Sequence, residues 1–126
     1  MCSSDLISQA LNHGLQRSVS GSRILILGVA YKADIGDVRE SPALKLVELL
    51  RNGGSEVSYH DPHVPELPEH GLRSSPLEPA AYDCVVIVTA HSSIDYDRLA
   101  EDASLVVDLR NATGRNGSGN GKVWKL

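Results

Sequence analysis

Short runs of apolar and β-branched residues alternate along the chain with stretches in which apolar residues recur at helical spacing. The expected strands lie at residues 24–27, 56–60, 84–88 and 105–108, and each has the length of a typical strand. Strands that alternate with amphipathic helices are typical of a parallel sheet covered on both faces. We therefore predict an α/β fold with a doubly wound, mainly parallel, Rossmann-like sheet.

Helical spacing appears in three stretches, at residues 4–17, 42–52 and 96–103. The second helix has clear end signals: Ser41 can accept a hydrogen bond from a free amide, Pro42 suits the first helical position, and Gly53 follows the last turn. Its expected buried stripe consists of Leu44, Val47 and Leu50, with Leu46 and Leu49 as two further candidates.

Three segments complete the chain. Residues 62–79 contain five prolines, and their pattern predicts a long surface excursion without indicating its fold. Residues 114–121 are rich in glycine and predict a flexible connector rather than a phosphate-binding loop, because no lysine-serine pair and helix follow. Residues 122–126 are expected to form a last edge strand.

Length and composition limit the classes of protein that need be considered. A chain of 126 residues with 41% hydrophobic and 22% charged residues matches one ordinary globular domain, not a disordered chain or a disulfide scaffold. The net charge of −4 argues against a general nucleic-acid binder, and the four tyrosines and one tryptophan are too scattered to stack bases.

The hydrophobic runs and the cysteines bear on location. No apolar run approaches the roughly 20 residues of a membrane helix, and the first residues lack the pattern of a secretory signal. We therefore expect a cytoplasmic protein that does not span a membrane. Cys2 is terminal and Cys84 lies in an apolar strand, so we expect no disulfide and an inert, buried Cys84.

The loops after the expected strands are the first places to look for a ligand, because parallel α/β sheets bind ligands beyond the carboxyl ends of their strands. The loop after the first strand carries Lys32 and Arg39 and leads to a capped helix start, and Arg110 follows the fourth strand. Cations beside helix amides suit a phosphate or pyrophosphate. Alternatively, Lys32 and Arg39 only form ion pairs with acidic neighbours on a solvated loop.

This first loop lacks the glycine fingerprint of a dinucleotide site, because residues 28–31 read Gly-Val-Ala-Tyr. A complete NAD site in this domain is therefore not expected. Asp61 ends the second strand where a ribose-binding acid often falls, but without the glycine loop a turn with Pro62 is favoured.

Histidines offer weaker candidates. His60, His63 and His70 match no metal-ligand spacing, so we expect surface histidines and no metal. His91 follows the third strand, where it either contacts a ligand or belongs to a helix-entry turn, the favoured interpretation.

Residues 24–66 closely resemble the carboxyl-terminal domain of the UDP-glucose/GDP-mannose dehydrogenase family. The most specific motifs are GVAYK at residues 28–32, DVRESP at 37–42 and YHDP at 59–62. Residues 83–91 and 106–111 are also similar, so the resemblance covers almost the whole chain from Ile24 onward. Residues 1–20 resemble the end of a linking helix from a preceding domain, which leaves residues 21–126 as the UDP-sugar-binding domain.

The resemblance implies a function and site residues. Members of the family oxidise the 6-hydroxyl of a nucleotide sugar twice with two NAD, through a catalytic cysteine, and give a uronic acid for surface polysaccharides. By resemblance, Tyr31 and Lys32 contact the nucleotide sugar, Arg110 binds its diphosphate side, and Arg39 faces NAD bound by the amino-terminal domain. The motif wording is closest to UDP-N-acetylhexosamine 6-dehydrogenases.

The resemblance also shows what is missing from this stretch. By this resemblance we expect the NAD-binding and central domains to lie outside these 126 residues. Neither cysteine lies in the family's cysteine motif, so no catalytic residue is assigned and we expect the chain alone to be inactive. Its partners would be a UDP-sugar and those two domains, and a homodimer stays open. An alternative function is a non-catalytic interaction or oligomerisation module that uses the apolar stripe of the first helix. That stripe consists of Leu6, Ile7, Leu11 and Leu15.

A phospho-receiver domain of the flavodoxin-like type is a third hypothesis. It would need an acidic cluster at the end of the first strand, where this chain has Gly28 and Lys32.

Overall fold

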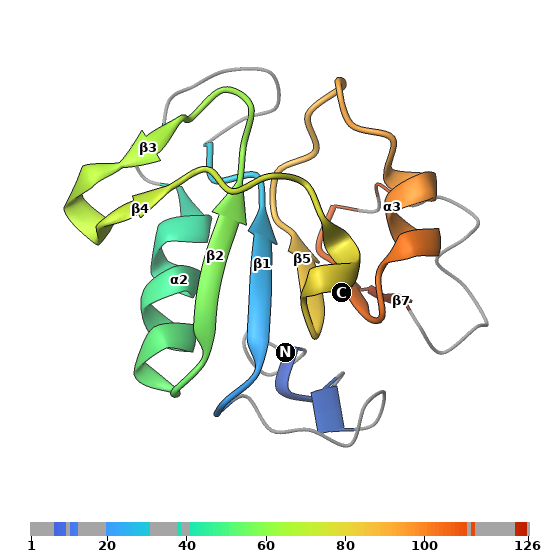
Figure 1. Cartoon of the computed structure of the whole chain (residues 1–126), viewed down its shortest axis with the longest axis horizontal. Coiled ribbons are helices and arrows are strands. Elements are labelled where there is room, and N and C mark those ends of the chain that lie inside the picture. The colour runs from blue at the N-terminus through green and yellow to red at the C-terminus, as the bar shows by residue number, and fades with distance from the viewer. Residues whose placement is uncertain are drawn as a thin grey trace.

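Five parallel strands form the central sheet in the order β2-β1-β5-β6-β7 (Figure 1). The computed structural model describes residues 7–9, 11–12, 20–30, 38, 41–110, 112 and 123–125. The strands are β1 (Arg23–Leu27), β2 (Glu56–His60), β5 (Cys84–Ile87), β6 (Val106–Asp108) and β7 (Val123–Lys125). Helix α2 (Pro42–Asn52) lies between β1 and β2 in the sequence, and α3 (Tyr96–Asp102) lies between β5 and β6. The predicted doubly wound α/β fold is therefore confirmed.

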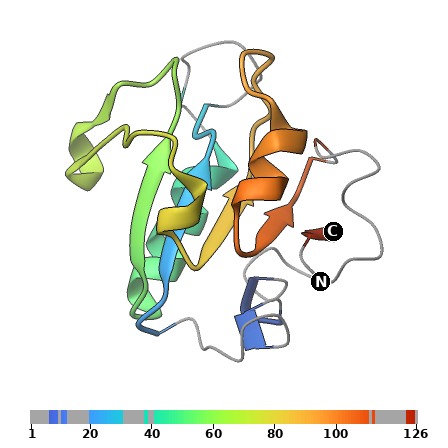
Figure 2. The same cartoon turned by 45° about the vertical axis from the view of Figure 1, so that its right-hand side comes forward.

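Each face of the sheet has its own apolar core, because successive side chains of a strand point to opposite faces. In β1, Ile24 and Ile26 pack with α2, whereas Leu25 and Leu27 pack with α3. Figure 2 shows the two helices on opposite sides of the sheet. All four side chains are closed to solvent, as expected for a central strand covered on both faces.

Helix α2 begins and ends where its sequence signals predict. The Ser41 hydroxyl oxygen accepts a hydrogen bond from the Ala43 amide at 3.3 Å, Pro42 occupies the first turn, and Gly53 caps the other end. Its buried residues are Ala43, Leu46, Val47 and Leu50. Leu44 is only half-buried and Leu49 is 46% exposed, so neither belongs to the fully buried stripe.

The proline-rich excursion, whose fold the pattern left open, forms a small flap beside β2. The flap contains β3 (Glu66–Leu67), the short helical turn η2 (Pro68–His70) and β4 (Leu72–Arg73). The chain then crosses to η3 (Pro79–Ala81), which contacts α3 (Figure 1). β3 and β4 pair antiparallel, and a bridge between Tyr59 and Ser74 attaches the flap to β2. Val64 and Leu67 bury their side chains in the core of the α2 face, which holds the flap in place.

Two described residues of the first predicted helix belong to the core. Residues 7–9 and 11–12 are helical, and Ile7 and Leu11 are fully buried in the cluster that includes α2. The hypothesis that this apolar stripe is exposed for a partner is therefore wrong at these two positions, whereas Leu6 and Leu15 lie outside the described residues. Of the described helices, none is long and apolar enough to cross a membrane.

Candidate functional site

The carboxyl ends of β2, β1, β5 and β6 bring the segments that follow them to one edge of the sheet (Figure 1). From β1 the chain continues to β2 on one side, and β5 lies on the other side of β1. The connections therefore change direction at β1, and ligands of parallel α/β sheets bind beside such a point. The described residues at this edge include Val29 and Ala30 after β1, Asp61 after β2, His91 after β5 and Arg110 after β6.

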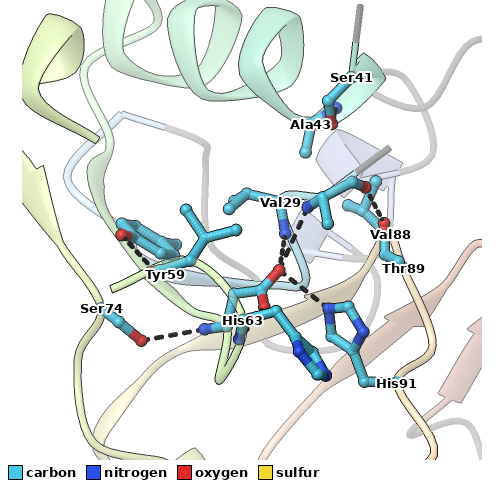
Figure 3. Close-up of polar contacts among 12 residues, drawn as sticks. Val29, Ser41, Ala43, Tyr59, His63, Ser74, Val88, Thr89 and His91 are labelled. Atoms are coloured by element: carbon cyan, nitrogen blue, oxygen red, sulfur yellow. Dashed lines mark hydrogen bonds and ion pairs between the residues drawn. The ribbon is translucent and has the colours of Figure 1, made fainter. Parts of the chain in front are cut away.

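The Asp61 carboxylate joins the ends of three strands. Its Oδ2 accepts hydrogen bonds from the backbone amides of Val29 at 2.8 Å and Ala30 at 3.1 Å, and its Oδ1 accepts one from the His63 amide at 2.8 Å. The side chain of His91 contacts the same Oδ2 through Nε2 at 2.9 Å. Figure 3 draws these contacts around Val29, His63 and His91.

The His91 imidazole is completely closed to solvent. The ring of the exposed residue His63 lies over it, with the centroids 4.6 Å apart and the planes tilted by 53° (Figure 3). The backbone amide of His91 donates to the hydroxyl oxygen of Tyr96 at 2.8 Å. Since the oxygen that Nε2 contacts belongs to a carboxylate, which only accepts hydrogen bonds, Nε2 carries the proton and donates to Asp61.

Asp61 is held in its charged form. Burial alone would raise the pKa of this carboxyl group, but the hydrogen bonds from His91, His63 and Val29, together with the attraction of His91, outweigh burial and place the pKa below its ordinary value of 3.8. The buried Asp61 side chain is therefore a negatively charged carboxylate at the carboxyl edge of the sheet, and N–H donors surround it.

The backbone after β1 is also held from the other side. The Thr89 hydroxyl donates to the carbonyl oxygen of Ala30 at 2.7 Å, so both polar backbone groups of Ala30 are bound by side chains. On the β2 side, the Asp61 amide donates to the Ser74 hydroxyl oxygen at 3.0 Å, which connects the pair to the flap. Both oxygens of the Asp61 carboxylate therefore accept hydrogen bonds from within the protein.

Arg110 stands at the same edge, exposed to solvent. Its Nε donates to the Val88 carbonyl oxygen at 2.9 Å, and its backbone amide donates to Oδ1 of Asp108 at 3.0 Å. Within the described part of the chain, no carboxylate lies within ion-pair distance of its guanidinium group. The side chain is therefore a positioned cation, with terminal N–H groups that suit an anionic ligand.

The other predicted site residues, Tyr31, Lys32 and Arg39, lie outside the described residues. Their contacts with a ligand, and the convergence of Lys32 and Arg39 with Arg110, remain predictions.

Two buried side chains with ionisable groups have structural roles. Burial raises the pKa of the Cys84 thiol to about 12, which agrees with the inert packing predicted for it. The Tyr59 hydroxyl donates to the Val64 carbonyl oxygen at 2.9 Å. Burial, and then the charges of Asp61 and Glu66, raise its pKa to about 12. Neither group is charged near neutral pH.

A cavity of about 610 Å³ lies between α2 and the flap, lined by Val38, Leu44 and residues 66–70. None of Asp61, His91 and Arg110 lines this cavity. It is therefore separate from the polar cluster at the carboxyl edge.

Sequence reasoning missed the pairing of Asp61 with His91. The favoured turn at Asp61 does exist, since its Oδ1 accepts from the His63 amide, but the main contacts of the carboxylate are with β1 and β5. At His91 the favoured interpretation is a helix-entry turn. That interpretation does not predict that the side chain is buried and contacts Asp61. The one signal available was that both residues directly follow expected strands, which parallel topology brings to one edge.

Comparisons with known proteins identify the family and the fold. Residues 25–115 match the family model described as the UDP-binding domain of the UDP-glucose/GDP-mannose dehydrogenase family. UDP-glucose 6-dehydrogenase of Rhizobium meliloti is 36% identical over 104 residues, which cover 74% of this chain and 24% of that protein. UDP-N-acetyl-D-mannosamine dehydrogenase of Pyrococcus horikoshii is 37% identical over 93 residues, which cover 70% of this chain and 21% of that protein.

Solved structures show the same fold. The UDP-D-ManNAc dehydrogenase from Pyrococcus horikoshii superposes with a TM-score of 0.76 at 28% identity, covering 98% of this chain and 29% of that one. The NDP-N-acetyl-D-galactosaminuronic acid dehydrogenase from Methanosarcina mazei gives a TM-score of 0.80 at 23% identity, covering 98% and 27%, which shows the fold alone. The chain thus spans about a quarter of the length of the relatives it matches.

Proposed function

Because this chain belongs to the UDP-glucose/GDP-mannose dehydrogenase family, through the UDP-binding domain of that family, we propose that it binds the UDP part of a nucleotide sugar at the carboxyl edge of its sheet. The two relatives compared above are named for UDP-glucose and for UDP-N-acetyl-D-mannosamine. UDP is the part that these two substrates share, so it is the ligand to which the proposal commits.

The observation that carries the proposal is Arg110. The Arg110 guanidinium is exposed at the carboxyl edge, is oriented by its bond to the Val88 carbonyl and is paired with no described carboxylate, so its remaining N–H groups are available to an anion. The diphosphate of UDP supplies such an anion. Tyr31 and Lys32, which match the family motif, are proposed to contact the same nucleotide sugar.

NAD is the cofactor that the family implies, and the described residues of this domain do not fit its pyrophosphate. In a dinucleotide fold the amides after the first strand face the pyrophosphate, whereas here the Val29 and Ala30 amides donate to Asp61. We therefore propose that NAD binds to a separate amino-terminal domain, with Arg39 facing it. This assignment treats residues 1–20 as a link to that part of the protein and residues 21–126 as the UDP-sugar domain.

The complete enzyme would be an NAD-dependent UDP-sugar 6-dehydrogenase in the cytoplasm that oxidises a nucleotide sugar to its uronic acid for polysaccharide synthesis. The role proposed for this chain in that reaction is binding and orientation, because no described residue supplies a nucleophile: Cys84 is buried within β5 and protonated near neutral pH.

Titration calorimetry of the chain with UDP tests the proposal. We expect binding that weakens by about tenfold or more in Arg110→Ala and in Lys32→Ala, the loss expected for one charge-assisted contact to phosphate. Arg23→Ala is the matched control, because it makes the same charge change at the opposite edge of the sheet, at the first residue of β1. Equal UDP affinity in wild type, Arg110→Ala and Lys32→Ala would contradict the proposed site.

A further inference from the structure

The Asp61 carboxylate occupies a position that in related folds is left for a ligand. In a dinucleotide-binding sheet, the amides after the first strand meet the phosphates of the ligand. Here the same two amides, of Val29 and Ala30, meet a carboxylate that comes from the end of β2. The protein thus supplies its own anion at this point. A ligand phosphate must therefore be held by side chains farther out, such as Arg110.

This internal anion fixes the start of the segment that carries the family motif. Tyr31 and Lys32 directly follow Ala30 in the sequence. The Ala30 amide is bound by Asp61 and its carbonyl oxygen by Thr89, from strands on the two sides of β1. The backbone of Ala30 is thereby held by two side chains that come from outside its own loop.

We propose that Asp61 and His91 are positioning residues of the nucleotide site, which fix the backbone from which Tyr31 and Lys32 extend without themselves contacting the nucleotide. The inference rests on the proposed function and adds to it the residues that orient the site. Both side chains are closed to solvent, with exposed fractions of 1% and 0%, so their effect on a ligand passes through the Val29 and Ala30 amides.

The role of His91 follows from the charge on Asp61. A buried carboxylate is stable only when its oxygens receive enough hydrogen bonds. Among the described residues, Nε2 of His91 is the only side-chain donor to the Asp61 carboxylate, and it binds the same oxygen as the two β1 amides. Without this donor the carboxylate loses the contact that holds it from the β5 side. Its hydrogen bonds with the Val29 and Ala30 amides are then expected to weaken. The neighbouring groups His63 and Tyr96 contact His91 but do not replace Nε2.

The experiment compares His91→Phe with His91→Gln in the whole chain. Phenylalanine keeps the volume of the ring but has no donor, whereas the Nε2 of glutamine can occupy the place of the imidazole Nε2. We expect UDP binding to weaken about tenfold in His91→Phe and to return to within about threefold of wild type in His91→Gln. The backbone amide NMR signals of Val29 and Ala30 are expected to shift in the first variant and to recover in the second.

Tyr59→Phe is the control for a purely structural effect. It removes a buried hydrogen bond next to Asp61 in the chain, from Tyr59 to the Val64 carbonyl, and leaves the β1 amides alone. We expect it to lower stability without changing UDP affinity.

Thr89→Val serves as a second variant if His91→Phe does not fold, because it removes only the hydroxyl bond to the Ala30 carbonyl. Its UDP affinity is expected to fall severalfold.

The outcomes separate the two proposals. The positioning role is overturned if His91→Phe or Thr89→Val binds UDP with wild-type affinity although the amide NMR signals of Val29 and Ala30 have shifted. The proposed function then still stands. A wild-type chain that binds no UDP, or an Arg110→Ala variant that binds it normally, overturns the proposed function and with it the positioning role. Affinity that falls equally in His91→Phe and Tyr59→Phe shows a structural effect only and also overturns the positioning role.

Discussion

Gly28 lies so close to Thr89 that a Cβ atom on the glycine would stand 2.3 Å from the carbonyl oxygen of Thr89 and 2.9 Å from its nitrogen. The backbone of Gly28 has a φ of +86°, a conformation that residues with a side chain rarely adopt. This close approach joins the end of β1 to the segment after β5, two residues before His91. The glycine that begins the family motif is therefore also required by the packing of the sheet edge.

We expect Gly28→Ala to lower the free energy of unfolding by about 3 kcal/mol or more, from the combined cost of the positive φ and of a clash with backbone atoms that cannot rotate away. Urea unfolding followed by circular dichroism measures the loss. Gly71→Ala is the matched control, since Gly71 has a φ of +67° with no atom near its added Cβ. An equal loss in both variants would show that the approach to Thr89 contributes nothing.

Asp61 should make stability depend on acid pH. The pKa of Asp61 in the folded protein lies below its ordinary value of 3.8, so the folded state releases the proton more readily than the unfolded state. The ionised carboxylate therefore stabilises the fold fully above the unfolded pKa. This stabilisation is lost as the pH falls through the folded pKa. We expect Asp61→Asn to cost about 2 kcal/mol at pH 5, with a difference from wild type that narrows toward pH 3. Denaturant unfolding of both proteins at each pH gives the difference. A constant gap would mean that the charge of Asp61 is not what stabilises the fold.

Much of the fold was predictable because apolar runs and end signals act locally. Residues 24–27, 56–60 and 84–88 coincide with β1, β2 and β5 to within a residue at each end, and Ser41 and Gly53 bound α2 as predicted. The flap was not predictable, since its strands have two residues each and form only through contacts with β2. Leu49 shows a related limit, because helical spacing alone does not say which side of an apolar stripe the sheet covers.

From the sequence, Arg110 could be placed at the carboxyl edge because it follows an expected strand, and the structure has it there. Its contact with a nucleotide stays a prediction. Asp61 and His91 are 30 residues apart, and their bond forms because β1 brings β2 and β5 to its two sides. The local sequence around either residue does not indicate that the two side chains meet. The contact depends on the strand order of the sheet and not on a motif.

The first helix offers a test of which residues build the core. Leu11 is fully buried with the α2 cluster, whereas Leu49 on α2 is 46% exposed. We expect Leu11→Ala to lower the free energy of unfolding by about 3 kcal/mol and Leu49→Ala by less than about 1 kcal/mol. Thermal and urea unfolding of the two variants measure these losses. Equal small losses would mean that the first helix is an appendage to the domain.

Asp108 should control UDP binding through the loop that carries Arg110. Its buried Oδ1 accepts hydrogen bonds from the Arg110 amide at 3.0 Å and from the Ala112 amide at 3.1 Å, so one oxygen holds the backbone on both sides of residue 111. Asp108→Ala removes that acceptor and leaves two amides without it, whereas Asp108→Asn keeps an oxygen in the same place. We therefore expect UDP affinity to fall about tenfold in Asp108→Ala and to stay within about threefold of wild type in Asp108→Asn.

Calorimetry with UDP measures both variants, and proton NMR spectra confirm that each is folded. Arg110→Ala sets the scale, because positioning Arg110 cannot contribute more to binding than Arg110 itself does. The double variant Asp108→Ala/Arg110→Ala is then expected to bind UDP no more weakly than Arg110→Ala, since the two changes act on one contact. Losses that add in the double variant would show that Asp108 affects the nucleotide by another route, and that the loop after β6 does not act through its arginine.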